Sequence, residues 1–386
     1  MKRLMISDIT MKVESGVSSK ANQPNFILFI VGVLLGACMM AVYSTFFHRQ
    51  FNSTGNHMKF WGQPYSEHVN SLQQVNISDP QGHIEVNAEN RIEPHERLKF
   101  KQHHDLHYKD EDQVAKELYN KVRILCWIMT SPQTLESKAS NVKETWAKRC
   151  NVALFISSEH NADFPTVKIE TKEGREYLWQ KTRGAFQYIY DNYLDEADWF
   201  LKGDDDTFII VENLRYFLSD KNTNDPLYYG RKFKPYVNQG YMSGGAGYVL
   251  SKEAVRRLVE DAFKSSSKCR PATAVGGAED VDIGRCLQAV GVVAGDSRDE
   301  LGQDRFHPFV PEHHLIPGSV QKGFWYWKYI FYPSTEGLDC CSDYSISFHY
   351  ISPQSMYLME YLVYHMKPFG VGYYTCPAQQ KGSATS

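Results

Sequence analysis

The pattern of hydrophobic and polar residues differs from one stretch of the chain to the next. The first distinct stretch is an almost wholly apolar segment near the N-terminus. Residues 26–47 carry no charge, and a helix of that length, at ~1.5 Å per residue, spans the ~30 Å hydrocarbon core of a bilayer. A cleaved signal peptide is the alternative, but its apolar region is only about 7–15 residues long, with small residues at the cleavage site. Because this segment is longer and ends in Phe46, Phe47 and His48, it predicts a retained membrane anchor.

The basic residues around this segment predict its orientation. They are Lys2, Arg3, Lys12 and Lys20 before the segment, and Arg49 and Lys59 in the comparable stretch after it. Flanks rich in Lys and Arg stay on the cytoplasmic side of a membrane. We therefore expect residues 1–25 to form a cytoplasmic tail and the bulk of the chain to lie in the lumen.

The next stretch, residues 48–115, is polar, rich in Asn, His, Gln and Glu, and has little periodicity. Such a composition buries too little apolar surface to fold compactly, so we expect a lumenal stem. Residues 116–376 then form the folded domain, and residues 377–386 form a polar tail.

Within the folded domain, runs typical of strands alternate with segments of helical spacing. The predicted strands are 122–129, 152–156, 166–170 and 197–202, and the predicted helices are 140–148 and 174–193. This alternation predicts an α/β fold with a mainly parallel sheet covered by helices. After Gly240 we expect a strand at 248–250, helices at 252–262 and 281–290, and long aromatic loops.

Charge and cysteine content narrow the class of protein. The formal net charge is −3 and no basic run occurs, so nothing indicates a nucleic-acid partner. Cys38 lies in the apolar segment, and the absence of a CxxC pair argues against a zinc ribbon or a thioredoxin-like site. In an oxidising lumen the other seven cysteines are expected to form disulfides. Cys126 with Cys150 and Cys269 with Cys286 are candidate pairs, and the odd number leaves one cysteine free or joined to another chain.

Three adjacent carboxylates, Asp204, Asp205 and Asp206, follow directly on the predicted strand 197–202. Ligands of open α/β sheets bind at the carboxyl ends of strands, and adjacent carboxylates repel one another unless a cation is present. Oxygen ligands select a hard ion such as Mg²⁺ or Mn²⁺, which can bridge a nucleotide diphosphate. An acidic turn is the plainer alternative, but a buried strand that runs into bare carboxylates favours a metal site.

A second acidic element follows a glycine-rich loop. The loop is 242–248, and Glu279, Asp280 and Asp282 follow it in the first turn of a predicted helix. Carboxylates there stabilise the helix dipole, so capping is a sufficient explanation for Glu279 and Asp282. For Asp280 we favour a general base, because transfer of a group to a hydroxyl requires a carboxylate that accepts the proton.

Four motifs together resemble the β1,3-glycosyltransferase family that includes Fringe. They are SNVKETWAKRC at 140–150, FLKGDDDTF at 200–208, MSGGAGYVLS at 242–251 and GGAEDVDIGRCL at 276–287. The resemblance covers roughly residues 118–376. It implies a GT-A fold, in which a Rossmann-like nucleotide-binding half is fused to an acceptor-binding half, in a single-pass type II protein of the Golgi membrane.

Within this family, FWYWKY at 324–329 and SFHY at 347–350 are most similar to the core 1 branch. For that branch the resemblance implies inverting transfer of galactose from UDP-galactose to the 3-hydroxyl of N-acetylgalactosamine on Ser or Thr of glycoproteins. A Fringe-like transfer of N-acetylglucosamine is one alternative. A membrane-anchored lectin is another, and so is a non-catalytic chaperone relative, although such relatives lack the acidic motif. The resemblance also makes a homodimer an expectation and leaves the need for a dedicated chaperone open.

The resemblance assigns roles to individual residues. Mn²⁺ would be bound by Asp206 and His349, although a histidine in the strand-like segment 346–352, taken alone, is more typical of a core residue. The catalytic base corresponds to Asp280. The nucleotide donor is expected to contact Met129, Thr130, Glu173, Gly174, Arg175, Lys181, Asp204, Asp205 and Tyr350. Of these, Arg175 and Lys181 are the natural cations for a diphosphate, with solvated helix residues as the alternative.

The run at 324–327 is too aromatic for a plain surface loop. Aromatic faces offer contact area to sugars and extended peptides at low entropic cost. We therefore expect Trp325 and Tyr326 to bind the acceptor, with a core strand of alternating burial as the alternative.

Overall fold

The computed structural model describes residues 113–367. The predicted cytoplasmic tail at 1–25, anchor at 26–47 and polar tail at 377–386 lie outside the described residues, as do Cys376 and nearly all of the predicted stem. Among the residues that are described, no helix is long and apolar enough to cross a membrane.

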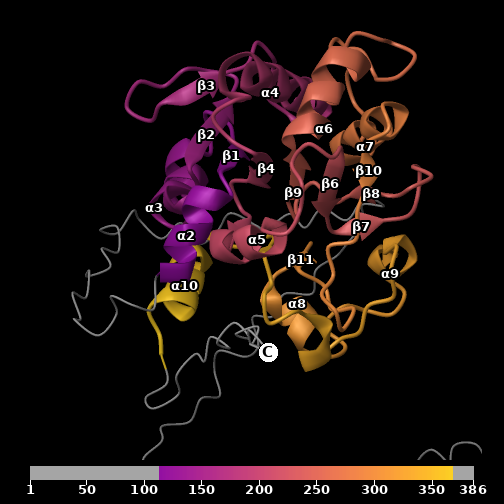
Figure 1. Cartoon of the computed structure of the whole chain (residues 1–386). Coiled ribbons are helices and arrows are strands. Elements are labelled where there is room, and N and C mark those ends of the chain that lie inside the picture. The colour runs from indigo at the N-terminus through magenta and orange to yellow at the C-terminus, as the bar shows by residue number, and fades with distance from the viewer. Residues whose placement is uncertain (1–112, 368–386) are drawn as a thin grey trace, which may run out of the picture. The chain divides into compact units, whose positions relative to one another are not determined.

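A seven-stranded sheet forms the centre of the domain, in the order β10-β6-β9-β4-β1-β2-β3 (Figure 1). Its strands are β1 (Ile124–Met129), β2 (Val152–Ser157), β3 (Thr166–Lys168), β4 (Trp199–Asp204), β6 (Leu227–Gly230), β9 (Tyr248–Ser251) and β10 (Val293–Ala294). β1 pairs in parallel with β2 and β4, whereas β9 is antiparallel to β4 and β6. The predicted α/β class and the mainly parallel sheet are confirmed, and β9 makes the sheet mixed.

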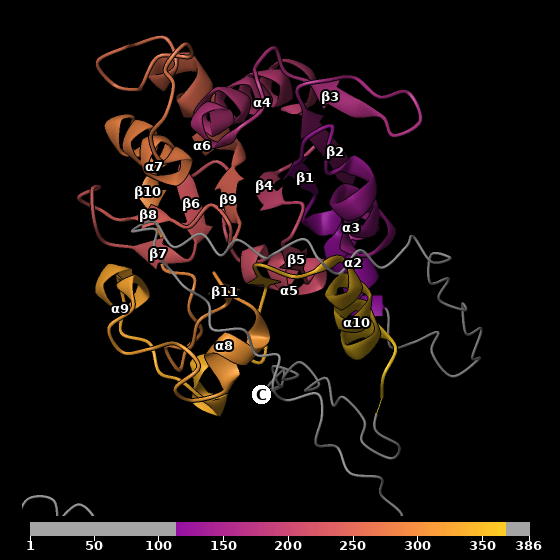
Figure 2. The ribbon, with the colours of Figure 1, turned by 180° about the vertical axis from the view of Figure 1, so that it is seen from behind.

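Helices cover both faces of the sheet. The α-helices of the described residues are α2 (Gln113–Lys121), α3 (Ser140–Glu144), α4 (Leu178–Tyr193), α5 (Val211–Leu218), α6 (Lys252–Arg257), α7 (Glu279–Ala289), α8 (Pro311–Leu315), α9 (Trp325–Tyr329) and α10 (Pro353–Tyr364). Of these, α8 and α9 lie away from the central sheet (Figure 1). Figures 1 and 2 show α4, α6 and α7 along one side of the sheet and α3, α5 and α10 along the other. The predicted helix 281–290 is confirmed as α7, which begins earlier, at Glu279.

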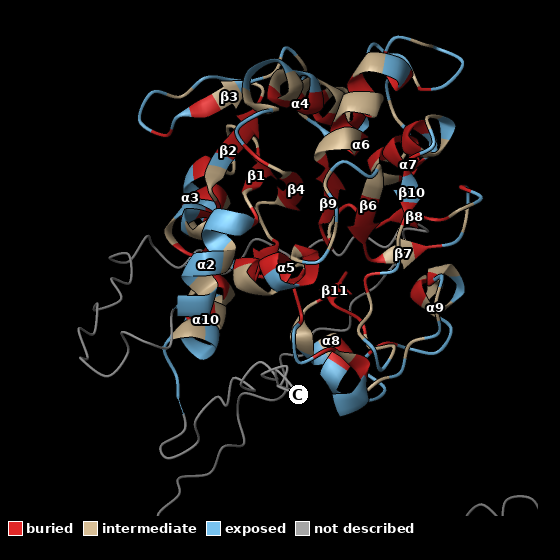
Figure 3. Cartoon of the chain, viewed as in Figure 1, coloured by how far each residue is buried: buried red, intermediate tan, exposed pale blue. Residues whose placement is uncertain are grey.

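The side chains of β1 divide the core in two. Ile124, Cys126 and Ile128 point to one face of the sheet and pack with side chains of α3, α5 and α10. Leu125, Trp127 and Met129 point to the other face and pack with side chains of α4, α6 and α7. Every residue of β1 is buried, because a strand in the middle of a parallel sheet is covered on both faces. This double burial, visible as the red centre of Figure 3, explains why the segment reads as a continuous apolar run.

Two predicted helices are interrupted. Residues 140–148 were expected as one helix, but the chain leaves α3 at Thr145, where φ is −102° and ψ is −106°. The Oγ1 of Thr145 donates to the carbonyl oxygen of Asn141 at 2.7 Å, a local hydrogen bond of the kind by which threonine competes with helical structure. Residues 252–262 likewise form α6 followed by a π-helical turn, Leu258–Ala262.

The C-terminal part of the domain builds a smaller layer. β5 (Phe208–Ile209), β11 (Phe306–His307) and β12 (Ser347–Phe348) form one sheet, and β7 (Lys232–Phe233) pairs with β8 (Tyr241–Met242). A third apolar cluster, centred on aromatic side chains such as Phe309 and Tyr326, packs beside them. The aromatic run at 324–327 enters this cluster as helix α9, so the alternative of a core strand is wrong.

Every cysteine among residues 113–367 is in a disulfide. The expected pairs Cys126–Cys150 and Cys269–Cys286 are present. A third disulfide, which sequence reasoning missed, joins the adjacent residues Cys340 and Cys341. The pairing agrees with the prediction of an oxidising compartment.

A buried ion pair fastens α10 to the rest of the domain. The carboxylate of Glu360 is fully buried and accepts two hydrogen bonds from Arg149, at 2.7 and 2.9 Å. Lys148 approaches the same carboxylate at 3.2 Å. The segment 140–150 and the last described helix are therefore held together by charge as well as by apolar contact.

Replacing Glu360 by Ala should destabilise the domain strongly, because the largely buried guanidinium of Arg149 loses the carboxylate that accepts two of its hydrogen bonds and keeps only the more distant Glu212, at 3.7 Å. We expect a loss of about 3–5 kcal/mol in the free energy of unfolding, measured by chemical denaturation. Asp195→Ala, which removes an ion pair with Lys252 at the surface, is the matched control and should leave the midpoint almost unchanged. Equal effects of the two substitutions would contradict the role given to Glu360.

Candidate functional site

One large cleft, of about 1230 Å³, opens at the carboxyl ends of β1 and β4. Its wall on one side comes from Met129 and Thr130 at the end of β1 and from the turn that follows β4. The opposite wall comes from the glycine loop and the start of α7. Aromatic side chains of the C-terminal layer close the remaining side. The cleft thus lies where ligands of open α/β sheets bind.

The acidic turn is brought to His349 by strand pairing. After Asp206 the chain enters β5, and Phe208 pairs with Phe348 of β12 in an antiparallel ladder. His349 follows β12 directly, and beyond it the backbone N–H of Ile351 donates to the carbonyl oxygen of Asp206 at 2.9 Å. Two segments far apart in the sequence therefore end at the same point of the cleft.

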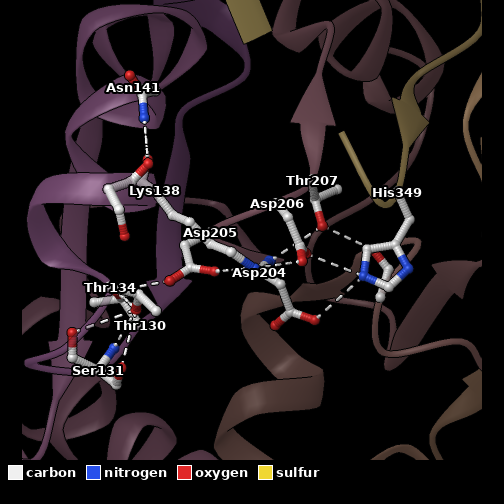
Figure 4. A network of polar contacts seen from close by, with 12 residues as sticks. Thr130, Ser131, Thr134, Lys138, Asn141, Asp204, Asp205, Asp206, Thr207 and His349 are labelled. Carbon is white, nitrogen blue, oxygen red and sulfur yellow. Dashed lines mark hydrogen bonds and ion pairs between the residues drawn. The ribbon is translucent and has the colours of Figure 1, made fainter. Parts of the chain in front are cut away.

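Asp204, Asp206 and His349 form a cluster suited to a metal ion (Figure 4). The Nε2 atom of His349 lies 3.1 Å from Asp206 Oδ1 and 4.0 Å from Asp204 Oδ2. Candidate ligand atoms of the three side chains all lie within 4.8 Å of one another. Two carboxylates and an imidazole are a plausible donor set for a divalent ion such as Mn²⁺.

Asp205 points the other way. Its Oδ2 accepts a hydrogen bond from Thr130 Oγ1 at 2.9 Å, and Figure 4 shows it turned toward Thr130 and Thr134. Burial, followed by the repulsion from Asp206, raises the pKa of Asp205 to about 6. The three adjacent carboxylates are therefore not equivalent, because the outer two face His349 and the middle one faces β1.

The charge of Asp206 is stabilised by two neighbours. Burial alone would raise the pKa of Asp206, but His349 and Lys138 together hold it well below its usual range. Lys138 Nζ donates to Asp206 Oδ2 at 3.0 Å and lies 3.9 Å from Asp205. Sequence reasoning missed Lys138, which lies far from the acidic turn in the chain and has no local signal.

Gly245 makes room for the His349 ring. A Cβ at this position would lie 2.1 Å from the ring, a distance that no side chain tolerates. Tyr350, in the left-handed region with φ of 59°, places its own ring beside that of His349, with 3.9 Å between the centroids. The glycine loop and the unusual backbone of Tyr350 together fix the position of the imidazole.

The residues expected at the donor nucleotide line the cleft, but Lys181 has a different role. Its side chain is 2% exposed, which excludes a solvated helix residue. Its Nζ donates to the carbonyl oxygen of Thr130 and to both carboxylate oxygens of Glu173, at 2.7–2.9 Å. Because an ammonium has three donors, this geometry does not fit the expected contact with a diphosphate. Lys181 instead orients Glu173, next to Gly174 and Arg175.

Asp280 lies half-buried at the start of α7, across the cleft from the acidic turn. Its Oδ2 accepts from the backbone N–H of Gly244 at 3.3 Å, and its Oδ1 accepts from the N–H of Val281 at 2.9 Å. Removal from water is the largest influence on this carboxyl and raises the pKa of Asp280. A raised pKa suits a residue that accepts a proton.

The two other acids of the first turn are not simple caps, since α7 has no side-chain cap. The buried Glu279 accepts hydrogen bonds from Thr182 at 3.0 Å and Tyr248 at 2.7 Å. Burial raises the pKa of Glu279 to about 7. Asp282 accepts from Arg270 at 2.6 Å. Both acids therefore have side-chain partners in addition to their place in the first turn of α7, where the helix dipole favours a carboxylate.

The aromatic side of the cleft includes Trp325 but not Tyr326. The side chain of Tyr326 is 1% exposed, and its hydroxyl accepts from Arg231, so the expected acceptor contact is wrong for this residue. α9 turns Trp325 and Tyr329 into the cleft, and Tyr329 shares a hydrogen bond with Tyr236 at 2.7 Å. Sequence reasoning missed Tyr236 and Tyr329, because an aromatic run does not reveal which side of a helix faces a cavity.

Comparison with known proteins gives a consistent picture. Residues 120–300 match the Fringe-like family. The chain is 52% identical over 268 residues to glycoprotein-N-acetylgalactosamine 3-beta-galactosyltransferase 1 of Xenopus laevis, a match that covers 69% of this chain and 73% of that protein.

More distant matches cover less. Beta-1,3-glucosyltransferase of Mus musculus is 28% identical over 39% of this chain and 30% of its own length. Chondroitin sulfate synthase 3 of Homo sapiens is 27% identical over 42% of this chain and 20% of its own. A solved glycosyltransferase involved in glycosylation of the major capsid of PBCV-1 covers 37% of this chain and 69% of its own, at 13% identity. Its TM-score of 0.25 is too low to support a conclusion.

The Xenopus match extends over most of both chains, and the Fringe-like match contains the acidic turn and α7. The resemblance seen in the four sequence motifs is thereby confirmed. The chain belongs to the glycoprotein-N-acetylgalactosamine 3-beta-galactosyltransferases, the core 1 or T-synthase branch of the Fringe-related β1,3-glycosyltransferases.

Proposed function

We propose that the chain transfers galactose from UDP-galactose, with inversion, to the 3-hydroxyl of N-acetylgalactosamine on Ser or Thr of glycoproteins. One observation carries the proposal. A single cleft contains both the metal-type cluster of Asp204, Asp206 and His349 and the acid Asp280. The chain that holds them is 52% identical to a protein named for this transfer.

We further propose a GT-A fold in which residues 116–376 form the catalytic domain. The anchor at 26–47 and the stem at 48–115 would hold it in the lumen of the Golgi. The disulfides support an oxidising compartment. A homodimer is proposed from the family resemblance, and a dedicated chaperone is a further candidate partner.

The residues of the cluster fit Mn²⁺, which we propose as the cofactor. Asp206 and His349 would hold the ion, with Asp204 beside them, and the space left by Gly245 keeps the imidazole in line with the carboxylates. Bound there, the ion would neutralise charge on the leaving diphosphate. Lys138 brings positive charge from the chain itself to the same carboxylates.

The donor nucleotide would bind along the wall at the end of β1. Met129 and Thr130 line this wall with Glu173, Gly174 and Arg175. Lys181 holds the carboxylate of Glu173 in place at this wall, where it would lie beside the nucleoside. Asp205 would lie near the ribose or the sugar, and Tyr350 would contact the nucleotide from the opposite side.

The transfer is a single displacement. Asp280 accepts the proton of the acceptor hydroxyl. At the same time the hydroxyl oxygen of the acceptor forms a bond to the anomeric carbon of galactose, and the bond from that carbon to the diphosphate oxygen breaks. Attack from the face opposite UDP inverts the configuration, and no covalent intermediate with the protein is required. Trp325 and Tyr329 offer aromatic faces to the acceptor sugar.

Three alternatives are less well supported. A lectin or a chaperone relative has no need of Asp280 or of the acidic turn, and both are present at the cleft. Transfer of N-acetylglucosamine would use the same residues.

The wild-type full-length chain in detergent should transfer galactose from UDP-galactose to an N-acetylgalactosaminyl-threonine peptide and leave UDP-N-acetylglucosamine unused. The reverse preference would establish the alternative.

Asp280→Asn should abolish proton acceptance and leave the rest of the cleft intact. We expect kcat for galactose transfer to fall by about 10³-fold, the scale of general base catalysis, with UDP binding measured by calorimetry unchanged. Asp282→Asn, two residues further along α7 and outside the proposed chemistry, is the control. An Asp280→Asn variant that folds and turns over normally would remove Asp280 from the mechanism.

Gly245→Ala should disable the metal site without removing a ligand. The added methyl would collide with the His349 ring, so the ring must leave its place beside Asp206. We expect loss of Mn²⁺ binding, measured by calorimetry, and loss of the transfer activity that EDTA also removes. Gly323→Ala is the control, since its added methyl meets no atom within 4 Å. Normal Mn²⁺ affinity in Gly245→Ala would rule out His349 as a ligand.

A further inference from the structure

Lys202 is a charged residue inside the buried sheet. It lies on β4, where its register partners are Trp127 on β1 and Tyr248 on β9, and its side chain is 2% exposed. A buried ammonium between aromatic neighbours is unfavourable unless anionic or polar partners surround it. Its position therefore calls for an explanation beyond packing.

The partners of Lys202 come from both sides of the cleft. Its Nζ donates to Asp204 Oδ1 at 2.5 Å and to the carbonyl oxygen of Gly244 at 3.0 Å. Burial opposes the charge and lowers the pKa of Lys202, but Asp204, Glu279 and Asp280 outweigh this effect and raise it overall. The ammonium therefore forms an ion pair with Asp204 and also interacts electrostatically with Glu279 and Asp280, the first two acids of α7.

Gly244 connects the cation to the proposed base. Its carbonyl oxygen accepts from Lys202, and its N–H donates to Asp280 Oδ2 at 3.3 Å. A Cβ on Gly244 would lie 2.9 Å from Glu279 Oε2 and 3.6 Å from Lys202 Nζ. The loop is thus packed closely against both, and a displacement of Lys202 would be passed to Asp280.

We propose that Lys202 is a positioning residue that holds Asp204, on the donor side, and Asp280, on the acceptor side, in one fixed geometry. The inference rests on the proposed function, because Asp280 is assigned there as the base. Without the ammonium, Asp204 and the two acids of α7 would repel one another, and the Gly244 carbonyl would lose its buried donor.

The charge of Lys202 also bears on the pH dependence of the reaction. The groups that interact with Asp280 are Lys202 on β4, Glu279 on α7, Tyr241 on β8 and Tyr228 on β6. Of these four, Lys202 favours the ionised form of Asp280. The base must be ionised, so kcat/KM falls as the pH drops through the pKa of Asp280. Loss of Lys202 should therefore move this acid limb to higher pH.

The test compares Lys202→Met and Lys202→Arg with the wild type, as full-length chains. For Lys202→Met we expect kcat to fall by about 100-fold, the scale of a small misplacement of catalytic groups. We also expect the acid limb to move up by about one pH unit. Lys202→Arg keeps the charge and should return the acid limb close to its wild-type position.

Arg215→Met is the matched control. Arg215 is a buried cation whose hydrogen bonds go to the carbonyl oxygens of Val122 and Arg149 and to Asn151, with no carboxylate among them. Its loss should lower the melting temperature but leave kcat and the acid limb of the folded protein unchanged. A purely structural role for Lys202 would make Lys202→Met behave in the same way.

The outcomes separate the inference from the proposed function. A wild-type chain that binds UDP but does not transfer galactose contradicts the proposed function. An active wild type, with a folded Lys202→Met variant of normal kcat and unmoved acid limb, overturns the inference alone. If Lys202→Met does not fold, Lys202→Gln replaces it, because glutamine can still donate to the Gly244 carbonyl but has no charge. The same changes in kcat and in the acid limb are then expected.

Discussion

Repulsion among carboxylates is the constraint on which the rest of this structure depends. Asp204, Asp205, Asp206, Glu279 and Asp280 all line one cleft, and like charges removed from water are unfavourable without cations or donors nearby. The domain places a cation or a hydrogen-bond donor beside each of these side chains. Lys138 and His349 face Asp206, Thr130 donates to Asp205, and Lys202 lies against Asp204. Much of the polar architecture follows from this need, including the lysine inside β4 and the hydroxyls around Glu279.

The topology serves the same purpose through a few short pairings. β4 ends at the acidic turn, and β5, which follows the turn, pairs with β12, so that the residue after β12 faces the turn. The glycine loop leads into β9, which lies next to β4. Because Gly244 and Gly245 have no side chains, the loop lies directly against the start of α7 and against His349. The central sheet thus supplies one fixed edge, and three separate loops meet there with little freedom to move apart.

Sequence reasoning predicted the features that are marked by neighbouring residues in the chain. β1 and β4 were predictable because continuous apolar runs mark strands buried on both faces, and Asp206 and Asp280 because they adjoin an element end. His349 was found through family resemblance, since a histidine in a strand carries no sign of what it faces. Lys202 did carry a signal, a charge inside an otherwise buried strand, but sequence reasoning assigned it no role. Tyr326 was misassigned because the orientation of α9 depends on Arg231, which is remote in sequence.

The pairing of β5 with β12 has a consequence for the order in which the protein matures. Domains are synthesised from the N-terminus, so the acidic turn leaves the ribosome long before the segment that carries His349. Contacts between residues distant in sequence form slowly, because the loop between them must close first. During that interval the central sheet can form with its carboxylates unopposed by the imidazole. In a nascent or truncated chain that ends before β12, the acidic turn would thus lack both its pairing partner and the imidazole of His349, and the cluster of Asp204, Asp206 and His349 can form only once the C-terminal layer is complete.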